Sequence, residues 1–154
     1  MRQNLLLLIL CAVIGFTSSA AAEEPKYGTA KEAEAMMDKA LQYFNANGKE
    51  KAFPDFTDRE GAFIDRDLYI FVVDYDGLTL AHGGNAKLVG NNMKNLQDPD
   101  GKFFIQEMME TAKKGGGWVD YKWTNPETKK IQNKSTLIKP LPGIDAFMGC
   151  GIYK

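Results

Sequence analysis

The sequence predicts an α+β fold in which a long N-terminal helix leads into an antiparallel sheet of about five strands, with one helix laid across the sheet. Three observations support this class. A helix-capping pattern precedes a periodic apolar stripe, an apolar run at Tyr69–Val73 turns through Asp74–Gly77 into a second short run, and three strand-like segments follow a second amphipathic helix. This order of elements suits one domain with a single core.

The first helix begins with a capping-box pattern, because Thr29 offers an N-cap hydroxyl and Glu32 a carboxylate three residues later. Gly48 supplies the left-handed residue that ends the helix. The apolar stripe between them is Ala33, Met37, Ala40, Leu41 and Phe44. Beyond it we expect one or two further turns over Lys49–Phe53, ending before Pro54. The polar segment that follows has aromatic anchors at Phe53, Phe56 and Phe63.

The run Tyr69–Val73 is apolar at nearly every position, which predicts a strand at the centre of the sheet, covered on both faces. Asp76-Gly77 is a strong hairpin signal, because glycine adopts positive φ without a steric clash. The returning strand, Leu78–Ala81, ends at His82, the only histidine of the chain. The hairpin therefore places one imidazole at the end of its second strand.

The remaining elements follow from composition and period. The Gly- and Asn-rich segment Gly83–Asp98 predicts a long ordered loop with a short helical turn. A helix over Lys102–Lys114 is expected to end at the glycine run Gly115–Gly117. The last strands are expected over Trp118–Thr124, Ile131–Leu141 and Ala146–Tyr153.

Residues 1–22 have the pattern of a secretory signal peptide, which leaves residues 23–154 as one domain. The apolar run Leu5–Phe16 is too short to span a bilayer comfortably, and Ala20-Ala21-Ala22 fits the cleavage pattern. We therefore expect cleavage after Ala22, a periplasmic or secreted protein, and no membrane span after cleavage. The alternative is an uncleaved membrane anchor.

Charge and composition argue against several functions. Without Arg2, 18 of the 19 basic residues stand against 20 acidic ones, and this near-neutral balance argues against nucleic-acid binding. One histidine and one mature cysteine, Cys150, cannot build a closed zinc site, so we expect neither metal nor cofactor. Ser135 lacks a nucleophile-elbow pattern, and an enzyme that uses His82 ranks last because no paired catalytic group is evident.

A small-molecule pocket suits the residues better. Tyr121 and Trp123 project from one face of a strand, Lys134 lies on the neighbouring strand, and His82 ends the central hairpin. An aromatic wall, a cation and a neutral donor together suit a small carboxylate. Taken singly, the lysine is also compatible with a solvated strand position and the aromatic residues with plain core.

Several of these residues fall in a pattern that resembles the single Cache domain, the extracytoplasmic sensor module of bacterial chemoreceptors and histidine kinases. The pattern comprises Tyr69, Phe71, Val72, Asp74, Gly77, His82, Asn85, Leu88, Gly90, Asp98, Gly101, Gly117, Tyr121, Trp123, Lys134, Gly149, Gly151 and Tyr153. The resemblance covers Thr29–Tyr153 and implies a PAS-like antiparallel sheet whose pocket takes small organic acids. Family members often carry proline after the histidine, where this chain has Gly83. They also tend to have an aromatic residue a few positions after the pocket lysine, where this chain has Leu137.

The sequence thus predicts an exported, sensor-type domain that binds a small organic carboxylate and carries out no catalysis. Lys134 would pair with the carboxylate, His82 and Tyr121 would hydrogen-bond to it, and Trp123 and Phe71 would wall the pocket. Such a domain would report to a separate membrane sensor or transporter. The alternative is a periplasmic interaction subunit with a vestigial pocket, which would dock through an exposed apolar stripe on its first helix.

Overall fold

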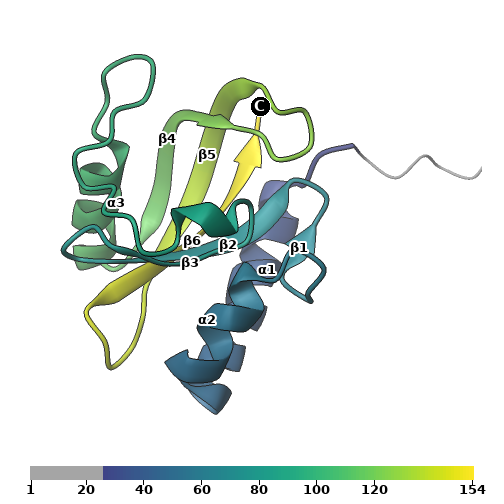
Figure 1. Ribbon diagram of the computed structural model, residues 1–154, viewed down its shortest axis with the longest axis vertical. Helices are drawn as coiled ribbons and strands as arrows, with labels where there is room; N and C mark the ends of the chain where they lie inside the picture. Colours follow the sequence, from purple (N-terminus) through teal and green to yellow (C-terminus); the bar gives the residue numbers. More distant parts are fainter. Residues whose placement is uncertain (1–25) are drawn as a thin grey trace, which may run out of the picture.

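The computed structural model describes residues 26–154 as an α+β fold with an antiparallel sheet between helices (Figure 1). The elements in order are α1 (Ala30–Asn47), α2 (Lys49–Thr57), β1 (Ile64–Asp65), β2 (Leu68–Asp74), β3 (Thr79–His82), the 3-10 turn η1 (Ala86–Leu88), α3 (Phe104–Lys113), β4 (Gly117–Thr124), β5 (Ile131–Pro140) and β6 (Ala146–Tyr153). The predicted fold class is confirmed. The predicted signal peptide lies outside the described residues.

The sheet has the order β1-β2-β6-β5-β4, and β3 also pairs with β2. Every pairing is antiparallel. The chain therefore leaves the first hairpin, crosses the loop and α3, and returns so that its last strand pairs with its first long one. The five predicted strands are present, and the two-residue β1 is an addition that the sequence did not indicate.

The central strand β2 is covered on both of its faces, as its apolar run predicts. Ile70 and Val72 pack into the core beneath α1 and α2. Tyr69, Phe71 and Val73 pack into a second core with α3 and β4. Figure 1 shows α3 on the side of the sheet away from α1 and α2. The pocket residues predicted from the sequence belong to the α3 side.

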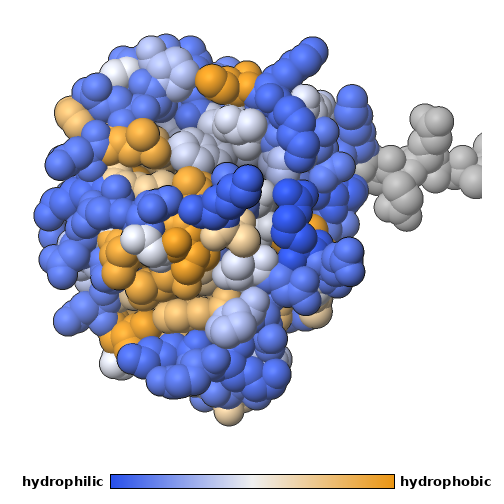
Figure 2. All heavy atoms as spheres, in the orientation of Figure 1, coloured by the Kyte–Doolittle hydropathy of each residue, from blue (hydrophilic) through white to orange (hydrophobic). Residues whose placement is uncertain are grey.

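Helix α1 has the predicted capping box, with Thr29 and Glu32 bonded in both directions. Its apolar stripe faces the sheet and is buried at Ala33, Met36, Met37, Ala40 and Phe44. The docking alternative needed that stripe to be exposed, and the structure places it in the core instead. Apolar residues do reach the surface elsewhere, and Figure 2 shows them gathered in the middle of one face, ringed by hydrophilic ones.

The prediction that the helical turns end before Pro54 is wrong, because α2 continues through this proline to Thr57. A proline inside a helix forfeits one backbone hydrogen bond at a cost of about 3 kcal/mol. Tertiary contacts offset this cost: the side chain of Phe56 is fully buried, and Asp55 accepts a hydrogen bond from Tyr43 of α1. Within residues 26–154, no helix combines the length and the apolar character needed to cross a bilayer.

Candidate functional site

The site is built around a cross-strand row of side chains on the α3 face of the sheet. The register pairs Lys134 of β5 with Tyr121 of β4 on one side and with Tyr153 of β6 on the other. Gly151 makes room for this row, because a Cβ atom there would lie 2.6 Å from Cε of Lys134 and 2.2 Å from Oγ1 of Thr136. The glycine thus lets the lysine side chain lie against the backbone of β6.

The ammonium of Lys134 is buried among phenols. The side chain is only 1% exposed, and its Nζ donates to the hydroxyl of Tyr69 at 2.6 Å and to that of Tyr153 at 3.2 Å. Nζ also lies 3.9 Å and 4.6 Å from the centroids of these two rings. Within the described part of the chain, no carboxylate oxygen lies within 4.0 Å of it. Burial lowers the pKa of Lys134 to about 7.

His82 is buried in a single tautomer. It is 3% exposed, and its Nδ1 accepts a hydrogen bond from the backbone N–H of Asn85 at 2.9 Å, which leaves the proton on Nε2. Burial, assisted by the nearby charge of Lys134, lowers the pKa of His82 to about 3. The ring packs against Tyr69 and Phe71, with centroids 5.0 Å and 5.9 Å away. At neutral pH, His82 is therefore an uncharged hydrogen-bond donor.

A cavity of about 370 Å³ opens beside His82. Its floor contains the buried side chains of Tyr69 and His82, and its rim contains the exposed Arg59 and Lys129. The other lining residues are Gly84, Asn85, Leu88, Trp123, Thr124 and Pro126. Two residues predicted from the sequence, His82 and Trp123, thus line this cavity. Lys134 does not line it, but its Nζ is bonded to Tyr69, which does.

Phe71 and Tyr121 wall a second, much smaller space of about 10 Å³ that also touches His82 and Trp123. That volume holds about one water molecule. The Tyr121 ring stacks on Phe104 with centroids 4.7 Å apart, and its hydroxyl accepts a bond from Thr136 at 3.2 Å. The structure therefore brings His82 and Trp123 to the open cavity, whereas Phe71 and Tyr121 belong to this packed side.

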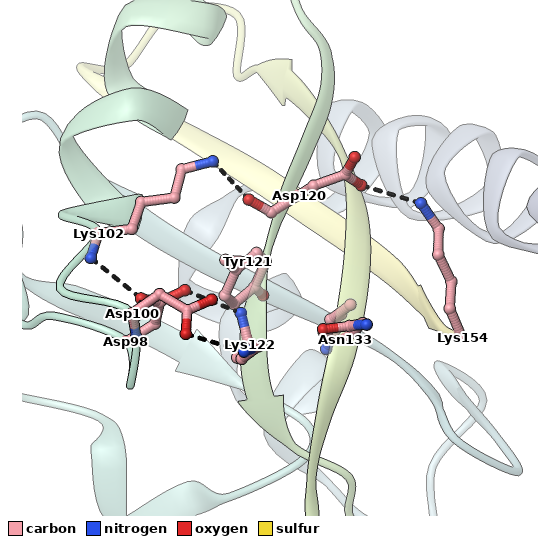
Figure 3. Close-up of a pocket in the computed structure, with 9 residues that line it drawn as sticks. Asp98, Asp100, Lys102, Asp120, Tyr121, Lys122, Asn133 and Lys154 are labelled. Carbon is pink, nitrogen blue, oxygen red and sulfur yellow. Dashed lines mark hydrogen bonds and ion pairs between the residues drawn. The ribbon is translucent and has the colours of Figure 1, made fainter.

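A third hollow, of about 320 Å³, lies where β4 and β5 meet the loop before α3 (Figure 3). Lys134 and Tyr121 also line this hollow, and its exposed charges are paired: Lys122 with Asp100 at 2.8 Å and Lys154 with Asp120 at 3.1 Å. Asp98 accepts backbone N–H groups and organises the turn, and no cluster in the described residues could hold a metal ion. The paired charges favour a structural role for this hollow.

Four residues that sequence reasoning missed contribute to the site. Tyr69 and Tyr153 hold the ammonium of Lys134, and Arg59 and Lys129 lie at the rim of the cavity. Tyr69 and Tyr153 were visible as strand residues on the same face as Tyr121, so the alternation of β2 and β6 carried a signal for them. The rim residues lie in loops, where no periodicity indicates a direction.

The chain is similar to a part of each of two bacterial signalling proteins. The sensor histidine kinase MctS of Rhizobium johnstonii is 40% identical over 88 residues, which cover 57% of this chain and 19% of that protein. The methyl-accepting chemotaxis protein McpP of Pseudomonas putida is 28% identical over 90 residues, covering 58% of this chain and 16% of that protein. The chain therefore matches less than a fifth of the length of either relative.

Solved structures share the fold. A methyl-accepting chemotaxis protein from Vibrio parahaemolyticus superposes with a TM-score of 0.70 at 25% identity, covering 80% of this chain and 86% of that one. A Cache chemosensory domain described for its carboxylic acid recognition superposes with a TM-score of 0.63 at 24% identity, covering 80% and 86%. A family model described as Single Cache domain 2 matches residues 19–154. The chain therefore belongs to the Single Cache domain 2 family, whose members include the extracytoplasmic sensor modules of chemoreceptors and histidine kinases.

Proposed function

We propose that this chain is an exported sensor domain that binds a small organic carboxylate, carries out no catalysis and reports to a membrane sensor or transporter. The observation that carries the proposal is the ammonium of Lys134, buried with phenol oxygens and aromatic rings but no carboxylate. A buried cation with no carboxylate within 4.0 Å is costly. The more distant charge of Asp67 offsets that cost only in part, and a bound anion would relieve it.

Each predicted site residue has a role in this proposal. Lys134 pairs with the carboxylate, and His82 donates to it through Nε2–H, since Nδ1 is already bonded to Asn85. Tyr121 donates its own hydroxyl proton, because its oxygen is the acceptor for Thr136. Trp123 and Phe71 supply the apolar wall. A ligand that reaches Tyr121 has to part the packed rings around the 10 Å³ space.

The expected affinity is modest. A charge-assisted hydrogen bond contributes roughly 1.5–3 kcal/mol. An acid of about six heavy atoms, at about 1 kcal/mol per atom, gains about 6 kcal/mol, which corresponds to a Kd of tens of micromolar. The similarity in fold to a chemosensory domain described for carboxylic acid recognition supports the same ligand class.

The test is thermal unfolding of the wild type and of Lys134→Met with a panel of small acids at millimolar concentration. We expect at least one acid to raise the wild-type Tm by several degrees and to leave the variant unchanged. Lys122→Met is the matched control, because Lys122 lies on the neighbouring strand but is half-exposed and paired with Asp100. If no acid shifts the wild-type Tm, the proposal is wrong.

A further inference from the structure

The open cavity beside His82 carries positive charge at its rim. Arg59 follows α2, and Lys129 lies in the loop between β4 and β5, so two segments far apart in the chain bring cations to one opening. Both side chains are exposed, and the residues that line the cavity include no aspartate or glutamate. Its charged lining residues are therefore all cations.

The charges of these two residues are not compensated. Arg59 donates from Nη1 to the carbonyl of Gly84 at 3.3 Å, and Lys129 donates to the carbonyl of Pro126. Neither belongs to any ion pair formed within residues 26–154, whereas many other surface lysines do, including Lys51, Lys102, Lys113, Lys122, Lys139 and Lys154. Cations clustered around a concave site raise the positive potential inside it and so attract an anion.

The cavity is larger than a short monocarboxylate needs. Its 370 Å³, in the measure in which one water molecule needs about 10–15 Å³, leaves room for a molecule longer than a short monocarboxylate. The buried floor has one recognition point, where His82 offers Nε2–H and Tyr69 is bonded to Lys134. The exposed rim has a second recognition point at Arg59 and Lys129.

We propose that the ligand is a dianion, a dicarboxylate of four or five carbons. One carboxylate meets the floor at His82 and at Tyr69, whose hydroxyl is bonded to Lys134, and the other meets the rim at Arg59 and Lys129. This inference rests on the proposed function and deepens it, because it names the chemical class that would reach both the floor and the rim of the cavity. The rim acts as the specificity-determining part of the site, and the floor supplies binding common to all acids.

Calorimetric titration with acids matched in length tests the inference, using succinate against butyrate and glutarate against pentanoate. We expect a dicarboxylate to bind about tenfold more tightly than its matched monocarboxylate, since each exposed ion pair contributes up to about fivefold in affinity. Arg59→Gln/Lys129→Gln should remove that advantage and leave monocarboxylate binding within twofold. The control is Lys49→Gln/Lys130→Gln, which removes two exposed cations that do not line the cavity.

The outcomes separate the two proposals. If monocarboxylates bind but dicarboxylates bind no more tightly, the dianion is wrong and the carboxylate-binding function stands. An equal loss for both acids in Arg59→Gln/Lys129→Gln also overturns it, because the rim then attracts any anion without selecting its length. If neither kind of acid binds, both proposals are wrong.

Discussion

Replacement of the buried lysine by methionine provides a sharp physical test of the site. Lys134→Met keeps an unbranched side chain one atom shorter than lysine and removes its charge. The pKa of Lys134 falls from 10.5 to about 7 on folding, so keeping the ammonium in the folded chain at or below pH 7 costs about 5 kcal/mol. The substitution removes this cost, but it also removes the hydrogen bonds of Lys134 to Tyr69 and Tyr153, which offsets part of the gain in stability. We expect the ligand-free variant to be more stable by about 2–4 kcal/mol at pH 6 to 7.

The stability difference between Lys134→Met and the wild type should depend on pH. Between pH 7 and 10.5 the unfolded chain holds a proton at Lys134 that the folded chain has released. Wild-type stability therefore rises with pH in this window, by up to about 1.4 kcal/mol per pH unit, and the advantage of Lys134→Met shrinks. Urea unfolding of both chains at pH 6, 7, 8 and 9, followed by tryptophan fluorescence, measures this difference, with Lys122→Met as the exposed control. A difference that stays constant across these pH values would refute the buried-cation reasoning.

Three further predictions concern the same region. Because a carboxylate binds the protonated form of Lys134, its affinity should fall as the pH rises above about 7, by up to about tenfold per pH unit, with proton uptake measurable by calorimetry in buffers of different ionisation enthalpy. Gly151→Ala should lower the free energy of unfolding by about 2–3 kcal/mol, because its Cβ would lie 2.2 Å from Oγ1 of Thr136; a Tm equal to that of the wild type would contradict the packing described. Asp67→Asn should be at least as stable as the wild type at pH 7, because burial raises the pKa of Asp67 while its Oδ1 only needs to accept the N–H of Gly28 at 2.7 Å. As the solution is acidified and Asp67 takes up its proton, the wild type should become more stable relative to this variant, which urea unfolding at several pH values would detect.

The sequence predicts the elements well where local signals and burial agree. The run Tyr69–Val73 and the turn at Gly77 specify the hairpin, because a strand without polar positions has to be covered on both faces. The prediction for α2 was wrong at Pro54. The cost of a proline inside a helix is visible in the sequence, whereas the burial of Phe56 that offsets this cost is not. Local rules place an element but do not weigh its tertiary contacts.

The candidate site was less accessible to prediction. Alternation along β4 and β5 assigns Tyr121, Trp123 and Lys134 to one face, and no such rule states which residue of a third strand meets them. The partnership of Lys134 with Tyr153 depends on the β5–β6 register, which a single sequence does not encode in any short pattern. Arg59 and Lys129 converge only because two loops meet at the cavity rim.

The fixed tautomer of His82 has a consequence for how ligand binding would depend on pH. An imidazole is the side chain that most often changes charge between about pH 5 and 8. Here the burial of the ring and the nearby charge of Lys134 keep the pKa of His82 near 3, and the hydrogen bond from Asn85 fixes the tautomer, so it offers a ligand the same N–H donor across that interval. The group that titrates near neutrality is Lys134. A change of ligand binding with pH in this interval would therefore come from the amine of Lys134 and not from the imidazole of His82.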